Sequence, residues 1–238
     1  MDPEQILAAL AEVYATCMSY RDSGRVVTRF FHQNWRPRTD VKPFTTAFIR
    51  PDRFRFEYKS RRGEDEWDRY IISAEAGEVR TWWDVRPGIE QPASLSMVGA
   101  SGVSGGSSHT IPAMLMPQQI GGRRLTDLVA VASLGDEPLD GVTCYRLSGR
   151  FVPYPSDAAT EERRRAEAIR VTGRPPERAE HDPLTLWIDR GTLLVRRIEQ
   201  QVRFETFRTE QVTEYSPAVG VTILDDELRF DPPKQEDV

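Results

Sequence analysis

The sequence predicts a mainly β fold with helices. We expect a strongly curved antiparallel sheet, a half-open β-barrel, with an N-terminal helix and a short-helix lid over the concave face. Three observations predict it: helix-start signals in the first residues, strand-like segments joined by connections too short for parallel pairing, and a run of glycine and serine that interrupts the strands midway. We expect residues 1–238 to form a single domain.

The N-terminal helix is expected within residues 1–21. Asp2 is a suitable N-cap, a proline follows it, and Gln5 completes a capping-box pattern. Apolar residues then recur at helical spacing as far as Cys17, and the polar turn at 21–24 is expected to end the helix. A helix with one apolar stripe needs a surface to cover.

Strands are expected on both sides of the interruption, because segments rich in β-branched and aromatic residues alternate with short turns. The clearest alternation places Phe54, Phe56 and Tyr58 on one face, with arginine and glutamate on the other. The expected strands are 26–35, 41–50, 53–60, 66–74, 77–84, 128–134, 142–151, 184–189, 193–201, 202–215 and 227–230. A sheet that curls enough to protect its edges encloses an apolar concave surface.

Two stretches depart from the strand pattern. Residues 89–119 are expected to form lid helices and a hinge loop, in which Ile111, Met114 and Leu115 turn an apolar face to the sheet and glycine frees the backbone. Residues 156–182 form a charged insertion, expected to be an exposed helix followed by a proline-rich loop.

The composition excludes several classes of partner. The chain has 32 basic and 37 acidic residues, so no overall field favours a nucleic acid. No apolar run reaches the ~18 residues of a transmembrane segment. No export signal is visible, so a periplasmic or cell-envelope location requires that a signal has been removed, and a cytoplasmic location is expected otherwise.

The cysteines and histidines do not form a recognisable site in the sequence. Cys17 lies on the helical stripe and Cys144 in a strand, which favours two buried free thiols over a disulfide. The three histidines lie too far apart for a metal motif. We therefore expect no metal site and no cofactor.

Residues 102–106 match G-x-S-x-G, the nucleophile pattern of serine hydrolases. The motif depends on a buried parallel strand that leads through a tight turn into a helix, and the residues before Ser104 do not supply one. The usual triad order leaves only His181 as the base, because no acidic residue lies between Ser104 and His109. We expect no catalytic residues, and a hydrolase that uses Ser104 remains a remote alternative.

Several segments, in order along the chain, resemble the LolA-like lipoprotein carriers and their lipoprotein-sorting-like relatives. Residues 48–56 (FIRPDRFRF) resemble the family's strand, Arg-Pro turn and strand, and residues 77–83 (GEVRTWW) its next hairpin. Residues 186–189 (LWID) and 228–233 (LRFDPP) resemble its closing elements. The chain is more similar to members of unassigned role than to the carrier itself.

The resemblance implies a hydrophobic cavity under a lid. The arginine of the Arg-Pro turn, here Arg50, would hydrogen-bond the lid backbone and hold it closed. The expected cavity and lid residues are Phe54, Phe56, Tyr58, Trp82, Trp83, Ile111, Met114 and Leu115. The same side chains are also compatible with the core of a filled barrel, and Arg50 with a surface ion pair.

The expected function is non-enzymatic binding or transport of a lipid or an acylated, lipoprotein-like ligand in the cell envelope. Such a cavity needs a large apolar area at ~25 cal/mol per Å² and a lid that can move. A membrane-anchored protein is a further expected partner. The alternative is a protein-interaction or scaffold domain with a filled barrel, which would use an exposed sheet edge or the charged insertion.

Overall fold

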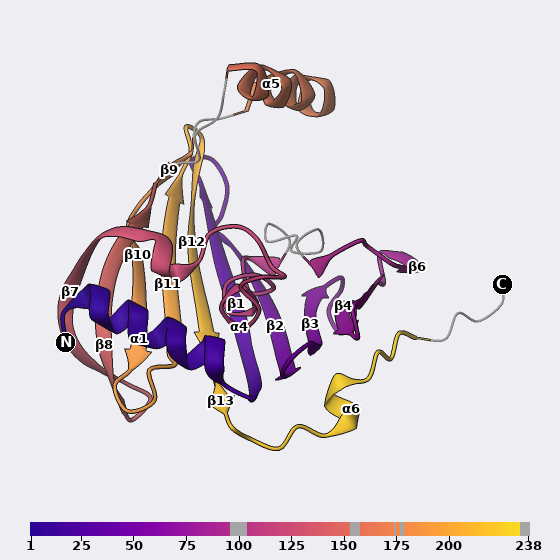
Figure 1. The fold of residues 1–238 in the computed structure, drawn as a ribbon. Helices are drawn as coiled ribbons and strands as arrows, with labels where there is room; N and C mark the ends of the chain where they lie inside the picture. The colour runs from indigo at the N-terminus through magenta and orange to yellow at the C-terminus, as the bar shows by residue number, and fades with distance from the viewer. Residues whose placement is uncertain (96–103, 153–157, 174, 177–178, 234–238) are drawn as a thin grey trace.

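One continuous antiparallel sheet carries the fold (Figure 1). The computed structural model describes residues 1–95, 104–152, 158–173, 175–176 and 179–233. The strands are β1 Ser19–His32, β2 Arg38–Ile49, β3 Arg53–Arg61, β4 Trp67–Glu75, β5 Glu78–Trp83, β6 Arg86–Glu90, β7 Leu128–Leu139, β8 Val142–Phe151, β9 Glu180–His181, β10 Leu184–Asp189, β11 Val195–Arg203, β12 Phe207–Tyr215 and β13 Ala218–Val219. The helices are α1 Pro3–Thr16, α4 Pro112–Leu115, α5 Ala158–Thr172 and α6 Asp225–Leu228, with a 3-10 turn, η1, at Leu125–Asp127.

The sheet is curved but open. Its strand order is β6-β5-β4-β3-β2-β1-β12-β11-β10-β8-β7, with β13 beside β1 and β9 beside β11, and all the pairings are antiparallel. Among the described strands, the outer pair β6 and β7 do not meet to close a barrel. This confirms the predicted half-open antiparallel sheet.

Helix α1 starts where the sequence predicts and ends earlier. The Gln5 amide donates to Asp2 Oδ1 at 2.8 Å, and both halves of the capping box are formed. The helix ends at Thr16, so the expected extension to residue 21 is wrong. Residues 21–24 instead pair with both β2 and the β12–β13 region as part of β1, because the sheet offers their backbone groups partners on two sides.

The C-terminal segment is not a strand, contrary to the expectation for residues 227–230. Three acidic residues open the short helix α6, and their charge suits a helix N-terminus. Leu228 packs with Ile223 against Ala47 and Ile49, on the convex face of β2. Short apolar segments cannot be assigned to helix or strand from periodicity alone, which explains the error.

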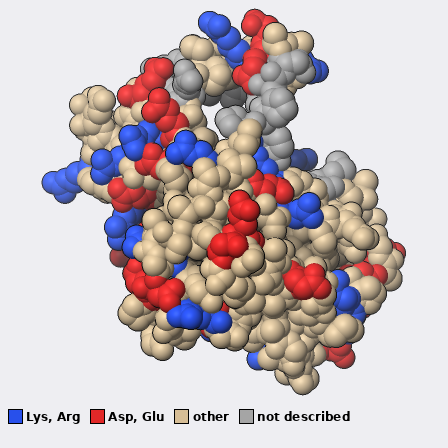
Figure 2. Space-filling view, turned by 60° about the vertical axis from the view of Figure 1, so that its left-hand side comes forward, with Lys and Arg blue, Asp and Glu red and all other residues tan. Residues whose placement is uncertain are grey.

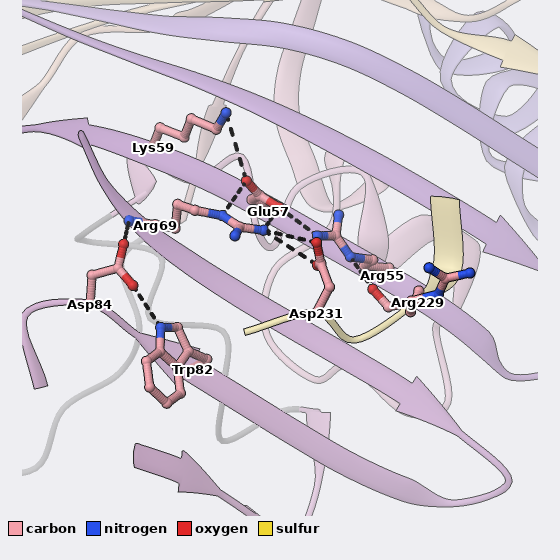
Figure 3. A network of polar contacts seen from close by, with 8 residues as sticks. All are labelled: Arg55, Glu57, Lys59, Arg69, Trp82, Asp84, Arg229 and Asp231. Atoms are coloured by element: carbon pink, nitrogen blue, oxygen red, sulfur yellow. Dashed lines mark hydrogen bonds and ion pairs between the residues drawn. The ribbon is translucent and has the colours of Figure 1, made fainter. Parts of the chain in front are cut away.

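Ion pairs attach the C-terminal segment to the convex face (Figure 3). Arg55 donates to the Arg229 carbonyl at 2.8 Å and to Asp231 at 2.7 Å. Arg69 donates to both carboxylate oxygens of Glu57, at 3.0 and 3.1 Å. Burial alone would raise the pKa of Glu57, but the hydrogen bonds from Arg69 and Arg55 outweigh it and hold the pKa below its usual value.

The concave face carries the core. Alternation along β3 places its aromatic side chains in the same buried cluster as apolar residues of α1 and α4, while Arg53, Arg55 and Glu57 take the convex face. The largest fully buried side chains include Tyr14, Tyr20, Phe48, Phe54, Phe56, Ile111 and Leu115. The sheet, the N-terminal helix and the lid therefore share one apolar cluster.

The structure also describes parts of the two stretches that interrupt the strand pattern, residues 89–119 and 156–182. Residues 86–90 form β6, so the strand pattern continues into the expected lid stretch. Residues 96–103, which include the first part of the expected hinge, lie outside the described residues. Helix α5 falls in the charged insertion, projects from one end of the sheet, and carries mostly exposed side chains (Figure 1). No helix in the described ranges has the length and apolar character that a membrane crossing requires.

The close contact of β1 with its neighbours makes Gly24 a sensitive position. A Cβ added there would lie 2.5 Å from the Phe44 ring and would also collide with the Glu214 carbonyl. We expect Gly24→Ala to lower the free energy of unfolding by about 3 kcal/mol, because the backbone oxygen cannot move aside without breaking the pairing of β1 with β12. Urea unfolding measures the change. Gly63→Ala, which meets only ordinary contacts of 3.6 Å or more, should change stability little; equal effects of both variants would contradict the prediction.

Candidate functional site

A cavity of about 590 Å³ lies between residues 104–125, which we call the lid segment or lid, and the concave face of β8, β10, β11 and β12. The sheet side is the larger contributor of apolar groups, and the lid side contributes glycines and polar side chains. The lining consists of Gly105, Gly106, His109, Thr110, Gly121, Gly122, Arg123, Leu125, Phe151, Leu184, Ile198, Gln200, Gln211, Thr213 and Tyr215. This position, under a lid and inside a half-barrel, is typical of a small-molecule site.

The roof of the cavity is held by polar contacts to backbone carbonyls. Gln211 donates from Nε2 to the Gly105 carbonyl at 2.8 Å, which joins the lid to β12. The ring of His109 lies with Nε2 at 2.6 Å from the Gly121 carbonyl and so joins the two ends of the lid segment. Gly105 has a φ of +65°, and a Cβ there would lie 2.7 Å from Val26, so glycine is required for this close approach.

Arg50 connects the lid to the sheet and to α1. Its Nε donates to the Cys17 carbonyl at 3.0 Å, and its Nη2 donates to the carbonyls of Tyr14 at 3.2 Å and Leu115 at 3.3 Å. One guanidinium therefore satisfies carbonyl groups at the C-terminal ends of both α1 and α4. The geometry is the one that the Arg-Pro motif implies, and the role of Arg50 as a latch stays a prediction.

A buried carboxylate lies in the core close to the cavity wall. Asp22 accepts a hydrogen bond from the Ser216 amide at 2.8 Å, and its environment includes Tyr14, Tyr20 and Tyr215, of which Tyr215 also lines the cavity. Burial raises the pKa of Asp22 to about 7, although the Ser216 amide and the more distant Arg196 favour the charged form.

Most of the residues expected to form the cavity and lid lie in the packed core beside the observed cavity. Phe54, Phe56 and Tyr58 are at most 2% exposed, and Ile111, Met114 and Leu115 on the lid at most 3%. None of these six lines the cavity. The buried cluster that the lid shares with the sheet is therefore filled at these six residues, and the open space lies over β8, β10, β11 and β12.

Trp82 and Trp83 lie on opposite faces of the sheet, because neighbouring residues of a strand alternate. Trp83 stacks edge-on against Tyr70, with ring centroids 6.1 Å apart, on the concave side. Trp82 donates from Nε1 to Asp84 at 2.6 Å, opposite Ile71 on the convex side. Trp82 is therefore not on the cavity side, which corrects the expectation that both rings line one cavity.

The sequence reasoning missed the cavity-lining residues of the second half of the sheet. They come from strands whose alternation is readable: Thr213 and Tyr215 line the cavity together with Gln211, at every second position of β12. The expected cavity lining was an apolar face, and several of these residues are polar. The alternation along β12 therefore did not indicate a cavity.

The hydrogen bonds described for the Ser104 hydroxyl join it to Ser108 and not to a histidine. Ser104 is 1% exposed, and its Oγ lies 2.7 Å from the Ser108 Oγ. The ring nitrogen of His109 is engaged by the Gly121 carbonyl. This geometry does not support the hydrolase hypothesis.

Neither metal clusters nor a disulfide occur among the described side chains. Groups of three or more His, Cys, Asp or Glu residues that could hold a metal ion are not found in the described ranges. Both cysteines are described, and both are free: Cys144 is buried and Cys17 half-buried. The preference for two free thiols is confirmed.

Comparisons with known proteins give similarity in structure only. No family model and no curated protein matches the chain. Similar solved structures include a LolA superfamily protein from Nitrosomonas europaea (10% identity, covering 96% of this chain and 98% of that chain, TM-score 0.34), the Mycobacterium tuberculosis lipoprotein LppX (10%, 90% and 92%, 0.42), and MucB in complex with MucA(peri) (11%, 97% and 60%, 0.45). The LolA-like group indicated by the sequence is thus among the similar structures. At TM-scores below 0.5, these similarities carry no argument about the site.

The contacts of Arg50 predict that Arg50→Lys loosens the lid. An ammonium group cannot reproduce the fork that reaches three carbonyls, so we expect stability to fall by about 1–3 kcal/mol and the amides of residues 113–116 to exchange faster. Hydrogen exchange followed by mass spectrometry measures this. Arg53→Lys is the matched control, because Arg53 makes only surface ion pairs with Glu75 and Asp225. Unchanged exchange in the lid of Arg50→Lys would contradict the prediction.

The buried Asp22 predicts a pH dependence of stability. Its pKa is raised from 3.8 in the unfolded chain to about 7 in the folded protein, so between these values the folded protein holds a proton that the unfolded chain has released. Its contribution to stability is complete below pH 3.8 and is lost as pH rises toward 7, by about 1.4 kcal/mol per pH unit. Asp22→Asn cannot ionise, so its stability relative to the wild type should rise over this range.

Urea unfolding over a pH series tests the Asp22 prediction, and Asp189 supplies a control of opposite sign. Burial would raise the pKa of Asp189, but Arg196 and the amides of Gly191 and Thr192 lower it. Its contribution is therefore present above the unfolded pKa and is lost in acid. Asp189→Asn should lose most stability near neutral pH. A parallel pH dependence in both variants would refute the assignment to Asp22.

Proposed function

We propose that the protein binds a lipid or another acylated ligand in the cavity beneath its lid. The observation that carries the proposal is the cavity of about 590 Å³ between the lid and the concave face. Ligand sites commonly measure ~300–1,000 Å³, so the space suits one small amphipathic molecule or part of a longer chain. The hydrogen bond from Gln211 of β12 to the Gly105 carbonyl holds the lid over this cavity.

The lining matches an amphipathic ligand. Leu125, Phe151, Leu184 and Ile198 supply apolar surface, against which each buried methylene contributes ~0.8 kcal/mol. Glutamine and threonine side chains of β11 and β12 and the lid histidine supply hydrogen-bonding groups. A ligand with an acyl chain and a polar head can satisfy both kinds of surface, whereas a purely apolar one would leave the polar groups without partners.

The packed half of the contact between the lid and the sheet extends the proposal to longer ligands. Ile111, Met114 and Leu115 belong to the same buried cluster as Phe54, Phe56 and Tyr58, and Arg50 binds the lid at Leu115. Displacement of α4 would separate these apolar surfaces and join them to the existing cavity, so that a longer chain could enter. Methionine in such a position adapts to different chains.

The motif resemblance supports the biological setting. Residues 48–56 and 77–83 resemble the LolA-like carriers, and Arg50 makes the lid contact implied by that motif. We therefore propose binding or transport in the cell envelope and not catalysis. The alternative, an interaction domain with a filled barrel, is supported only by the packed half of the sheet. Ligand binding by the wild type and by Gln200→Trp distinguishes the two functions.

Gln200→Trp should block the cavity. Gln200 lines it from β11, opposite Gln211, so an indole at this position occupies the ligand's space without removing a core residue. We expect wild-type protein to bind a fluorescent fatty acid and the variant to bind it about tenfold more weakly. Equilibrium titration measures the affinity, and mass spectrometry of organic extracts identifies any lipid that purifies with the protein.

Gln201→Trp is the matched control for this experiment. Gln201 lies opposite Glu210 on the convex face, so the same substitution one residue along leaves the cavity open. Its affinity should equal that of the wild type. No probe binding and no extracted lipid from wild-type protein would overturn the proposal, as would equal binding by Gln200→Trp.

A further inference from the structure

Aromatic side chains form a continuous stack at the tips of two neighbouring hairpins. The rings of Trp35 and His32 lie 5.7 Å apart, those of His32 and Phe207 5.1 Å, and those of Phe207 and Phe204 4.2 Å. His32 and Phe207 are directly paired across β1 and β12, so the stack joins the β1–β2 turn to the β11–β12 turn. We call these four residues the aromatic tip.

The aromatic tip does not belong to the core. None of its residues is a member of the core cluster, and Trp35 is 77% exposed, the highest value among the exposed large hydrophobic side chains described. His32 is also exposed, whereas Phe204 and Phe207 are half-buried beneath the outer rings. An exposed indole that is supported by further aromatic rings forms an apolar patch, and such patches mark binding surfaces on folded proteins. Stacking holds the rings together, so the surface is preformed.

The tip is continuous with the candidate site. On the concave side of β12, Phe207 is followed at every second position by Thr209 and Gln211, and Gln211 lines the cavity. The four residue steps from Phe207 to Gln211 span ~13 Å at the rise of an extended strand. The exposed rings therefore lie at the end of the concave strip that leads to the cavity.

The charges at the tip favour an anionic surface. Residues 31–38 contain Arg36 and Arg38 and no acidic residue. On the neighbouring hairpin, Arg203 and Arg208 are paired with Asp182 and Glu210, and the exposed Glu205 lies between Phe204 and Phe207. The positive charge is therefore confined to the β1–β2 turn, where Arg36 and Arg38 flank Trp35. Exposed tryptophan with flanking arginine suits the membrane interface, where indole rings lie at the level of the headgroups and guanidinium groups bind phosphate.

We propose that the aromatic tip docks the protein on an anionic phospholipid bilayer. Trp35 enters the interface, and Arg36 and Arg38 bind headgroup phosphates. Docking in this orientation places the concave strip against the membrane, so that the ligand moves between bilayer and cavity without crossing water. The transfer step rests on the proposed function, whereas the membrane contact rests on the tip alone.

Vesicle co-sedimentation tests the membrane contact directly. The probes are vesicles of phosphatidylglycerol and phosphatidylcholine in equal amounts and vesicles of phosphatidylcholine alone. We expect wild-type protein to bind the anionic vesicles, Trp35→Ser to bind them about tenfold more weakly, and Arg36→Gln about fivefold more weakly. Binding should weaken at high salt, because the attraction to the headgroups is screened.

Met18→Ser is the matched control. Met18 is 65% exposed and adjoins the opposite end of β1, so the change removes a similar exposed apolar group away from the tip. It should bind anionic vesicles as the wild type does. Trp35 has little buried contact to lose, so unfolding midpoints of all variants should agree and exclude misfolding.

Two readouts keep this inference separate from the proposed function. Equilibrium binding of a fluorescent fatty acid reports on the cavity and should be equal in Trp35→Ser and wild type, while its transfer rate to anionic vesicles should fall in the variant. Failure of wild-type protein to bind vesicles, or equal vesicle binding by Trp35→Ser, would overturn the membrane contact whatever the cavity binds. A loss of self-association in Trp35→Ser, with vesicle binding unchanged, would assign the tip to a second copy of the chain instead.

Discussion

The guanidinium of Arg50 is the point at which helix, lid and sheet meet. Each of the two helices ends with carbonyl groups that have no partner within the helix, and both ends lie over the β2–β3 turn, where Arg50 donates to three of these carbonyls. Because one side chain satisfies groups from two helices, neither helix can move away without leaving buried carbonyls unpaired. We therefore expect the position of the lid, and with it the roof of the cavity, to depend on this contact.

The two faces of the sheet have different roles for the same physical reason. Side chains alternate along each strand, so one face gathers aromatic and aliphatic groups and the other gathers charges. Acidic and basic side chains are interspersed on the surface in Figure 2, with no large area of a single sign. On the convex side, the ion pairs of Arg55 and Arg69 with Asp231 fix the C-terminal segment. The cavity of about 590 Å³ lies on the concave side.

The distribution of side-chain size decides where that space lies. Over β2–β4, stacked rings such as Phe44 and Phe56 fill the volume beneath the lid. Over β11 and β12, the concave positions carry smaller or polar side chains, including Thr213 and Gln211, and the lid segment opposite them is rich in glycine. The cavity is therefore next to the aromatic face that the sequence pattern indicated, and not within it.

Local patterns in the sequence determined much of this protein. The capping box of α1, the antiparallel meander and the buried face of β3 all depend on residues close together in the chain, and each was readable there. What the tertiary structure alone decided depends on residues far apart: the early end of α1, the docking of α6 on the convex face, the cavity between lid and β12, and the aromatic tip formed across two hairpins. Strand alternation names the residues that share a face, but only the curvature and register of the sheet decide which of them meet and how much space they leave.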